Sequence, residues 1–521
     1  MPVTPKIHRN DIYLFGLILL VIGIPLSNFL MSFSQLILLA NWLFDKNIGT
    51  KIKSFFANKP ALIFSLIFLL HLFGLIYTSD FDYAFKDLRT KIPVLFLPLI
   101  ISTSPIIDGK KFRLILSFFV ASVLFASVVC FYTYLTQEFV DIRKISVFIS
   151  HIRFSLDICM AICILFYFIY KDLFLSNTKK WILCVLLLWL VFFLFVLQSF
   201  TGIIILFFLF LIFLLYFTIS FKKWQYKLMT LSVLIALPLF IFIFIQSIVH
   251  SYFQVEKGSN VSLERFTPRG NLYAHDTISL GVENGNHIGL YVSQVELDKT
   301  WAERSKINID SNDRMGQRIS YTLIRFLNSK GLRKDADGVN ALKDSEIKAI
   351  ENGYANIIYL QKPGLQARIY KILFEYSSYM VSGNTRGHSI FQRFELWKAA
   401  VGIIRDNFWL GVGTGDMVTV YDKQLKDMKS DLAGQKLRAH NQYLSIFSAF
   451  GIIGFLIFIF ALIYPPILNR SFYDFYFLAF FIILCLSMIN EDTIESQAGV
   501  TFFAFFYSFF LLSRAKTTAA K

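Results

Sequence analysis

Long runs of apolar residues, separated by short polar connections, make up most of this chain. Several reach the roughly 20 residues that an α-helix needs to cross a bilayer. We interpret the first run as a retained helix, because no small-residue cleavage site follows it, and we expect a break at Pro25. The pattern predicts about twelve membrane-spanning helices, at residues 11–25, 27–44, 60–77, 92–103, 114–136, 154–170, 181–197, 202–219, 228–249, 442–464, 472–489 and 499–513.

Composition supports the same fold class. Of 521 residues, 56% are hydrophobic and 59 are Phe, which is more apolar surface than a soluble domain of this size needs. We therefore expect an all-α polytopic membrane protein. The cysteines lie in apolar runs without metal-ligand or disulfide spacing, which indicates structural roles; they are Cys130, Cys159, Cys163, Cys184 and Cys485.

The distribution of charge orients the chain. Its formal charge is +16, but most of the excess Lys and Arg falls in short connections on one side of the predicted membrane, which is typical of cytoplasmic loops. This pattern predicts cytoplasmic N- and C-termini and excludes nucleic acid as the reason for the charge. The alternation of helices leaves one long polar segment on the outer side, and the polar residues between helices 60–77 and 92–103 are expected to form a short outer loop.

We divide the chain into residues 1–249, with nine membrane helices; 250–441, a large outer insert; and 442–521, with three more helices. The insert is predicted to be a small mixed α/β structure. Its expected elements are a strand in 289–297, a helix with Asp344 or Ser345 as N-cap, an amphipathic helix over 366–380, and a surface helix over 391–408 that ends in a turn at Gly411, Gly413 and Gly415.

The strongest candidate site is Arg438-Ala439-His440-Asn441, at the mouth of helix 442–464. Polar groups beside lipid are costly and usually persist for function, although a headgroup anchor is an equal alternative. If the segment is helical, Arg438 and Asn441 share a face. The predicted topology places further polar residues on the same side: His151, Arg153, Arg386, His388, Arg393, Glu395, Arg405, Glu491, Asp492 and Glu495.

These residue types suit transfer from a diphosphate. Arginine binds phosphate through two parallel hydrogen bonds, and an imidazole among arginines is expected to stay neutral and to accept a proton from a hydroxyl. Arginines can stabilise a leaving diphosphate as a metal does elsewhere. The alternatives are surface roles for Arg386 and Arg405, a solvated helix face at Arg393, and an ordinary turn at Glu491.

Other motifs do not support a metal or a cofactor. The glycines at 411–415 are not followed by Gly-Lys-Ser/Thr, so a nucleotide loop is not indicated. HExxH and CxxC are absent from the sequence. His71, in the middle of a predicted helix, is more typical of a core histidine than of a proton relay.

Three motifs occur together in this sequence: Trp397 and the glycine turn after Arg393, Arg438-x-His440-Asn441-x-x-Leu444, and Gly451-x-x-Gly454. Together they resemble the O-antigen ligase/polymerase superfamily. The segment FLNSKGLRKDADGV in the insert and the turn NEDTIESQAG are similar to the Bacteroidetes-like branch of that family. The resemblance implies a GT-C-like, metal-independent glycosyltransferase of the bacterial inner membrane, with the insert in the periplasm. The implied donor is an undecaprenyl diphosphate-linked saccharide, and the implied acceptor is lipid A-core or another glycan.

The resemblance also implies residue roles. His440 and Arg393 match the family's essential histidine and arginine, so we expect them to be catalytic. We expect Arg438, Asn441, Arg153, Arg386 and Glu491 to bind substrate. The family usually has a further arginine in an outer turn that here reads QSFTG, with Phe200 in its place. Either Arg153 takes over phosphate binding, or the acceptor and donor are held differently.

We therefore expect an O-antigen ligase; the alternatives with the same chemistry are an O-antigen polymerase and an enzyme that glycosylates protein Ser or Thr. A lipid-linked oligosaccharide transporter is a further alternative from another class. A transporter needs charged groups within helix centres, and Asp157 and His71 are the main candidates for such groups.

Overall fold

The computed structural model describes residues 8–137, 142–171, 176–255, 263–361, 364–382 and 389–514. The chain forms two compact units. The first contains Met1–Gln137, Arg143–Phe210 and Arg393–Lys521, and the second contains Glu138–Ile142 and Leu211–Gln392.

The prediction of a polytopic helical membrane protein is confirmed. In the part of the chain that the structure describes, 8 helices are long and apolar enough to cross a membrane. They are α1 (Arg9–Leu26), α4 with its 3₁₀ extension (Lys59–Tyr77), α7 (Gly109–Thr136), α8 (His151–Lys171), α9 (Asn177–Val196), α10 (Phe200–Ser220), α11 (Trp224–Phe253) and α20 (Gln442–Leu468).

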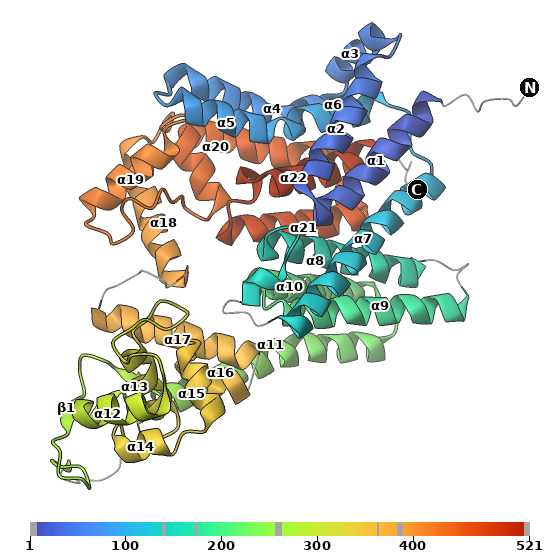
Figure 1. Cartoon of the computed structure of the whole chain (residues 1–521). Helices are drawn as coiled ribbons and strands as arrows, with labels where there is room; N and C mark the ends of the chain where they lie inside the picture. The colour runs from blue at the N-terminus through green and yellow to red at the C-terminus, as the bar shows by residue number, and fades with distance from the viewer. Residues whose placement is uncertain are drawn as a thin grey trace, which may run out of the picture. The chain divides into compact units, whose positions relative to one another are not determined.

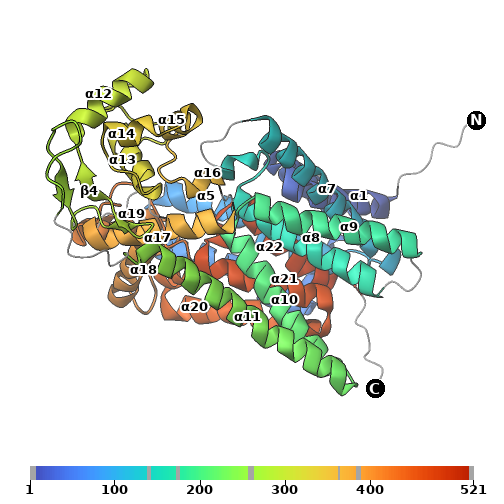
Figure 2. The ribbon, with the colours of Figure 1, turned by 90° about the horizontal axis from the view of Figure 1, so that it is seen from below.

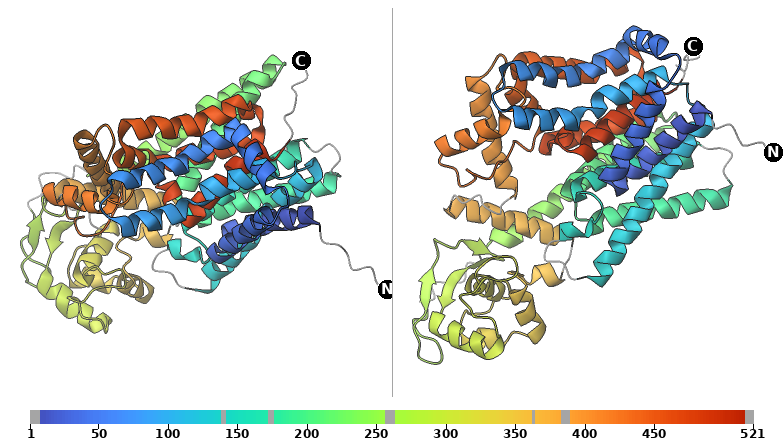
Figure 3. Two further views of the ribbon diagram at one scale, coloured as in Figure 1. Left: turned by 90° about the horizontal axis from the view of Figure 1, so that it is seen from above. Right: turned by 45° about the horizontal axis from the view of Figure 1, so that its top comes forward.

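The remaining predicted helices are present but shorter. They are α2 (Asn28–Leu43), α6 (Pro93–Thr103), α21 (Phe475–Asn490) and α22 (Gln497–Leu512). The expected break at Pro25 lies two residues later, at Ser27, whose extended backbone ends α1 and whose hydroxyl accepts a hydrogen bond from the amide of Leu30 in α2. Pro25 is tolerated in the last turn of α1, and α1 and α2 pack against each other (dark blue in Figure 3).

One predicted connection is wrong. Residues 78–91 were expected to form an outer loop, but α5 (Phe81–Lys91) is a helix that leads into α6, and α3 (Ile48–Ala57) is a further short helix. The Asp80 carboxylate accepts a hydrogen bond from the amide of Tyr83 and so caps α5, as expected for an aspartate at an N-cap. This helix contributes to the candidate site described below.

Helix α22 lies in the core of the first unit. Its residues from Gly499 to Leu511 are all buried, and it packs against α6, α21 and α5. Phenylalanine fills much of this core: Phe502, Phe503, Phe505, Phe506, Phe509 and Phe510 are each at most 4% exposed. Beside it, α4 and α20 run along each other (blue and orange in Figure 1).

Helix α20 is broken in its first half. Gly451 has φ 60° and ψ −167°, a backbone conformation that only glycine adopts readily. The groups released by the break bond to the chain after α18 (Ser389–Asp406): the amides of Val412 and Gly413 donate to the carbonyls of Ser448 and Ala449, and the amide of Ile452 donates to the carbonyl of Phe408. Backbone polar groups at membrane depth need such internal partners.

The predicted glycine turn is confirmed at Gly411 and Gly413, which have φ 71° and 95°. A Cβ on Gly411 would lie 2.3 Å from the backbone carbon of Ala449, and one on Gly415 would lie 2.0 Å from the carbonyl oxygen of Asp80. Because the amides of Val412, Gly413 and Gly415 already donate within the protein, the turn serves packing. It joins α18 to α4, α5 and α20.

We expect Gly411→Ala to lower stability by about 2 kcal/mol or more, because it adds a steric clash to an unfavourable φ. Gly434→Ala is the matched control, since Gly434 also has a positive φ of 84° but nothing within 4 Å of the added Cβ. Thermal unfolding of the detergent-solubilised protein measures both changes. Equal losses of stability in the two variants would show that the close approach of Gly411 to Ala449 does not cause the effect.

The second unit combines α11, two small antiparallel pairs and short helices. Strand β1 (Ala274–Asp276) pairs with β4 (Gly289–Val292), and β2 (Val282–Glu283) pairs with β3 (Asn286–His287). The helices are α12 (Gln294–Arg304), α13 (Ile319–Ser329), α14 (Ala336–Asn340), α15 (Asp344–Glu351), α16 (Ile358–Gln361) and α17 (Leu365–Ser382). Figure 2 shows α11 and α17, which pack against each other.

Two local predictions for this unit are partly wrong. The expected strand at 289–297 ends at Val292 because α12 starts at Gln294. The N-cap of α15 is Lys343, and the Glu346 carboxylate accepts a hydrogen bond from its amide at 2.8 Å. A buried ion pair also holds this unit together: both Glu283 carboxylate oxygens accept hydrogen bonds from Arg325, at 2.9 and 3.0 Å.

Candidate functional site

The short connection between α21 and α22 carries three acidic side chains with little exposure. We call residues 490–496, which include the 3₁₀ turn η4 (Thr493–Glu495), the acidic turn. Glu491 and Asp492 are buried, and the Glu495 side chain is 13% exposed. Buried carboxylates are costly unless cations or hydrogen-bond donors compensate them, and four other segments of the first unit provide such groups.

Arg393 on α18 is the first of these groups. One of its terminal nitrogens donates to the Glu491 carboxylate at 2.6 Å, and the Arg393 side chain remains 25% exposed. The structure therefore brings together two predicted site residues that are almost 100 positions apart in sequence. The guanidinium has further N–H donors beyond the one bonded to Glu491, and the partial exposure of the side chain makes it available to a ligand.

His440 is held through its backbone. Its amide donates to the Asp492 carboxylate at 3.0 Å, and the other oxygen of that carboxylate accepts from the Ser445 hydroxyl at 2.6 Å. The preceding carbonyl, of Ala439, accepts from the Trp397 indole at 2.9 Å. His440 has φ 49°, an uncommon conformation for a side-chain-bearing residue. Its half-buried imidazole has no hydrogen-bond partner among the residues that the structure describes.

The segment before α20 is not helical, so the expectation that Arg438 and Asn441 share a helical face is wrong. Helix α20 starts at Gln442, and Asn441 is its N-cap: its side-chain oxygen accepts from the amide of Leu444 at 3.1 Å. Asparagine is among the preferred N-cap residues. This bond uses the side-chain oxygen of Asn441 and leaves its amide nitrogen for other contacts.

Arg153, in the first turn of α8, reaches the acidic turn from another side. It donates to the backbone carbonyl of Asp492 at 2.8 Å and to the Ser496 hydroxyl at 3.2 Å. Its second terminal nitrogen is buried without a hydrogen-bond partner. The same acidic turn touches the QSFTG connection, because the Asn490 side chain donates to the Thr201 hydroxyl at 3.0 Å. Arg153 thus lies near the turn where Phe200 replaces the family's arginine.

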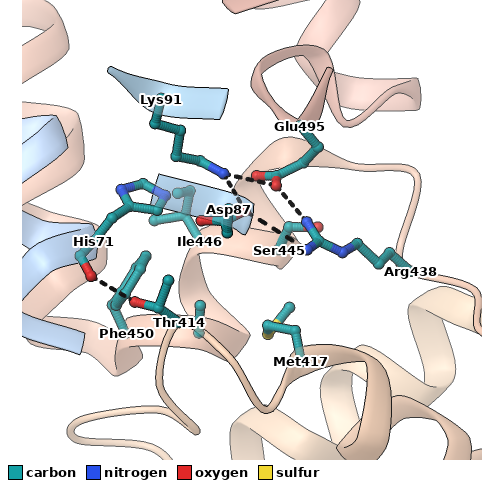
Figure 4. Close-up of a pocket in the computed structure, with 11 residues that line it drawn as sticks. His71, Asp87, Lys91, Thr414, Met417, Arg438, Ser445, Ile446, Phe450 and Glu495 are labelled. Carbon is teal, nitrogen blue, oxygen red and sulfur yellow. Dashed lines mark hydrogen bonds and ion pairs between the residues drawn. The ribbon is translucent and has the colours of Figure 1, made fainter. Parts of the chain in front are cut away.

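Arg438 belongs to a cluster of four charges with Asp87, Lys91 and Glu495, which we call the charge cluster (Figure 4). Lys91 donates to Asp87 at 2.5 Å and to Glu495 at 2.8 Å. Arg438 donates to Glu495, lies 3.7 Å from the Asp87 carboxylate, and its guanidinium carbon is 5.0 Å from the centre of the Tyr83 ring.

Burial and pairing perturb these groups in different directions. Burial raises the pKa of Asp87 to about 7, although the Lys91 charge acts against this shift. Burial acts to raise the pKa of Glu495 too, but the charges of Lys91 and Arg438 hold it well below its usual value. Burial acts to lower the pKa of Lys91, and Asp87 with Glu495 raises it above its usual value. Glu495 is therefore the permanent anion of the cluster.

Sequence reasoning missed Asp87 and Lys91 because residues 78–91 were interpreted as a loop. The spacing of four between these opposite charges is typical of neighbours on one helical face, and Asp80 is a typical N-cap. Gln442 was missed as well: its side chain donates to Glu495 at 3.1 Å and accepts from the amide of Ile494 at 2.9 Å.

The other candidate residues lie elsewhere. Arg386 and His388 lie outside the described residues, and Arg405 is exposed. His71 is buried beside the charge cluster, with one ring nitrogen 2.8 Å from the carbonyl of Ile67 and its ring against Phe450, as expected of a core histidine. In the described ranges, no group of three or more His, Cys, Asp or Glu residues could hold a metal ion. All five cysteines are free.

We expect Glu495→Gln to destabilise the protein by about 3–5 kcal/mol, because it leaves Lys91 and Arg438 without their shared carboxylate. Asp82→Asn on the exposed first turn of α5 is the control and should change stability little. Thermal unfolding at pH 7 measures both variants.

The same variant tests how stability changes at acidic pH. A carboxylate whose pKa is lower in the folded than in the unfolded protein stabilises the fold fully above its ordinary pKa. This contribution is lost as the pH falls through the pKa that the group has in the folded protein. The difference in melting temperature between wild type and Glu495→Gln should therefore shrink with acidification below about pH 4.5. A difference that stays constant down to pH 2.5 would contradict this role.

A comparison with protein-family models finds a match that covers part of this site. Residues 352–459 match the family model described as O-Antigen ligase, a range that includes Arg393, Arg438 and His440. A search of the curated proteins finds no match. Together with the apolar helices, the match supports a multi-pass bacterial membrane protein of the ligase or polymerase type, with glycosyltransferase-like activity and lipid-linked glycan substrates. Residues 352–459 thus match an O-antigen ligase domain, which supports the superfamily that the sequence resemblance implied.

Proposed function

We propose that this protein is an O-antigen ligase of the bacterial inner membrane. It moves a glycan from an undecaprenyl diphosphate carrier to an acceptor sugar such as lipid A-core, on the periplasmic side and without a metal ion. Both termini are then cytoplasmic, and the insert of residues 250–441 is periplasmic. The observation that supports this most is the convergence of Arg393, Arg438, Arg153 and the His440 segment on one acidic turn.

The reaction assigns a role to each group. The imidazole of His440 accepts the proton of an acceptor hydroxyl, whose oxygen attacks the anomeric carbon of the donor. The bond from that carbon to the diphosphate oxygen breaks, and the polyprenyl diphosphate leaves as an anion. Arg393, with its exposed donors, stabilises the charge that develops on the leaving group.

The remaining site residues bind the donor. Arg153 has a buried nitrogen without a hydrogen-bond partner, which suits a second phosphate contact and replaces the arginine absent at Phe200. Arg438 exchanges its carboxylates for the diphosphate. Glu491 keeps Arg393 oriented. Asn441 starts α20 behind His440 and offers its amide to the substrate, and Arg386 stays a proposed substrate ligand.

We expect His440→Ala to lower glycan transfer at least about 100-fold, because it removes the general base. Arg393→Ala should lower it by a similar factor, because it removes a donor to the leaving group. Transfer from a lipid-linked donor to purified acceptor measures the rate. Arg405→Ala, on an exposed position of the same helix, is the matched control and should stay near wild type, and wild-type rates in both site variants would exclude the proposed site.

A deletion strain separates ligase from polymerase. Loss of a ligase should leave lipid-linked polymer of normal length to accumulate while lipid A-core stays unsubstituted. Loss of a polymerase should instead reduce the attached glycan to single repeats, and unchanged lipopolysaccharide with altered glycoproteins would indicate transfer to protein. Electrophoresis of lipopolysaccharide and of the lipid-linked pool gives the answer.

A further inference from the structure

The charge cluster is balanced, with two cations and two anions in direct contact. Lys91 lies between Asp87 and Glu495, at 2.5 and 2.8 Å, and Arg438 contacts the same two carboxylates. The side chains of Lys91 and Asp87 are 1% and 7% exposed. At this burial, removal of one charged partner leaves an uncompensated charge, which is strongly unfavourable.

The two cations are anchored differently. Lys91 stands at the end of α5, and its ammonium bonds to both carboxylates. Arg438 comes from the non-helical segment before α20. Its guanidinium nitrogen Nη2 lies 3.7 Å from the Asp87 oxygen Oδ1, which is longer than a hydrogen bond. Arg438 is therefore the cation that can leave the cluster with the smaller rearrangement.

If Arg438 leaves, Lys91 alone faces two carboxylates. Both carboxylates keep the Lys91 ammonium, at 2.5 Å for Asp87 and 2.8 Å for Glu495, but Glu495 also accepts from the Gln442 amide at 3.1 Å. Asp87 is therefore the less compensated of the two carboxylates. A proton on Asp87 restores the balance. Beside it lies a cavity of about 10 Å³, which is room for about one water molecule.

The groups that face Asp87 are identified. They are Lys91 on its own helix, Arg438 from the segment before α20, Glu495 from η4, and His71 from α4, which lines the same cavity (Figure 4). Helices α6 and α22 also pack against α5 and carry no charged side chain.

We propose that Arg438 is a mobile diphosphate ligand whose move to the donor diphosphate is coupled to uptake of one proton by Asp87. In the free protein, Arg438 is paired with Glu495 and Asp87. This inference rests on the proposed function, because it needs a diphosphate donor. The proton comes from solvent and ends on the Asp87 carboxylate. Lys91 and Asp87 are positioning residues: they act on the donor through Arg438.

The electrostatics of Asp87 agree with this coupling. Burial raises the pKa of its carboxyl to about 7 while Arg438 is still close, and departure of a nearby cation raises it further. Binding therefore takes up more protons at pH 8, where Asp87 starts ionised, than at pH 6, where it starts largely protonated. Proton uptake on binding weakens affinity as pH rises.

The test measures proton uptake directly. The full-length protein in detergent is titrated with a short-chain polyprenyl diphospho-N-acetylglucosamine, whose two phosphates are diesterified and do not titrate near neutrality. Calorimetry at pH 8 in two buffers of different ionisation enthalpy gives the number of protons bound. We expect an uptake approaching one proton, and a Kd that rises by up to about tenfold per pH unit above pH 7.

Three variants on α5 test whether the proton is bound by Asp87. Asp87→Asn should bind the probe without proton uptake and with a Kd that no longer depends on pH between 7 and 8.5. Asp82→Asn, the exposed carboxylate on the same helix, should behave as wild type. Lys91→Met should bind the probe more weakly, because Arg438 is then the sole cation for both carboxylates.

The outcomes separate this inference from the proposed function. Absence of probe binding to wild type counts against the proposed function itself. Binding that depends on Arg393 but takes up no proton at pH 8, or that takes up the same number of protons in Asp87→Asn, overturns the coupling and leaves the transferase proposal intact. Because the wild-type measurement decides the first point, an Asp87→Asn protein that does not fold leaves the test valid.

Discussion

The candidate site depends on the cost of placing three carboxylates in a turn between two apolar helices. Glu491, Asp492 and Glu495 lose most of their contact with water there, and each needs a donor or a cation nearby. Donors to these carboxylates come from α5, α18, α20 and the segment before α20, and Arg153 on α8 donates to the backbone of the same turn. The acidic turn thus specifies where basic residues from distant parts of the chain meet, and it orients them before any substrate is present.

The backbone supports this arrangement at a second point. The break at Gly451 frees carbonyls in α20, and the glycine turn after α18 takes them up. This pairing fixes the end of α18, the helix that carries Arg393 and Trp397. Trp397 in turn bonds to the carbonyl before His440. The helix break at Gly451 therefore helps to position Arg393 relative to His440, the two residues of the proposed reaction.

Much of the fold could be predicted, because apolar runs of membrane length have few other structures open to them. The convergence of Arg393, Arg438, Arg153 and Glu491 followed from topology and residue type. The individual hydrogen bonds and ion pairs within the site could not be predicted from the sequence. Residues 78–91 are too polar for a membrane helix, so the sequence predicts a loop where α5 carries the Asp87–Lys91 pair. The start of α20 at Gln442 agrees with the prediction, but the idea that residues 438–441 are helical hid the role of Asn441 as its N-cap. The positive φ of His440 depends on tertiary contacts that sequence does not record.

The pairing of the site arginines with carboxylates affects which anions can bind to them. Arg393 and Arg438 are each paired with a carboxylate, so an anion that binds them must replace an existing charge-assisted hydrogen bond. A monoanion gains little by such an exchange, because the bond it forms resembles the one it breaks. A diphosphate has two adjacent charged groups and can engage several guanidinium groups together, including the unpartnered nitrogen of Arg153. In the proposed function, the carboxylates paired with these arginines therefore favour a ligand with the charge and reach of a diphosphate over a monoanion.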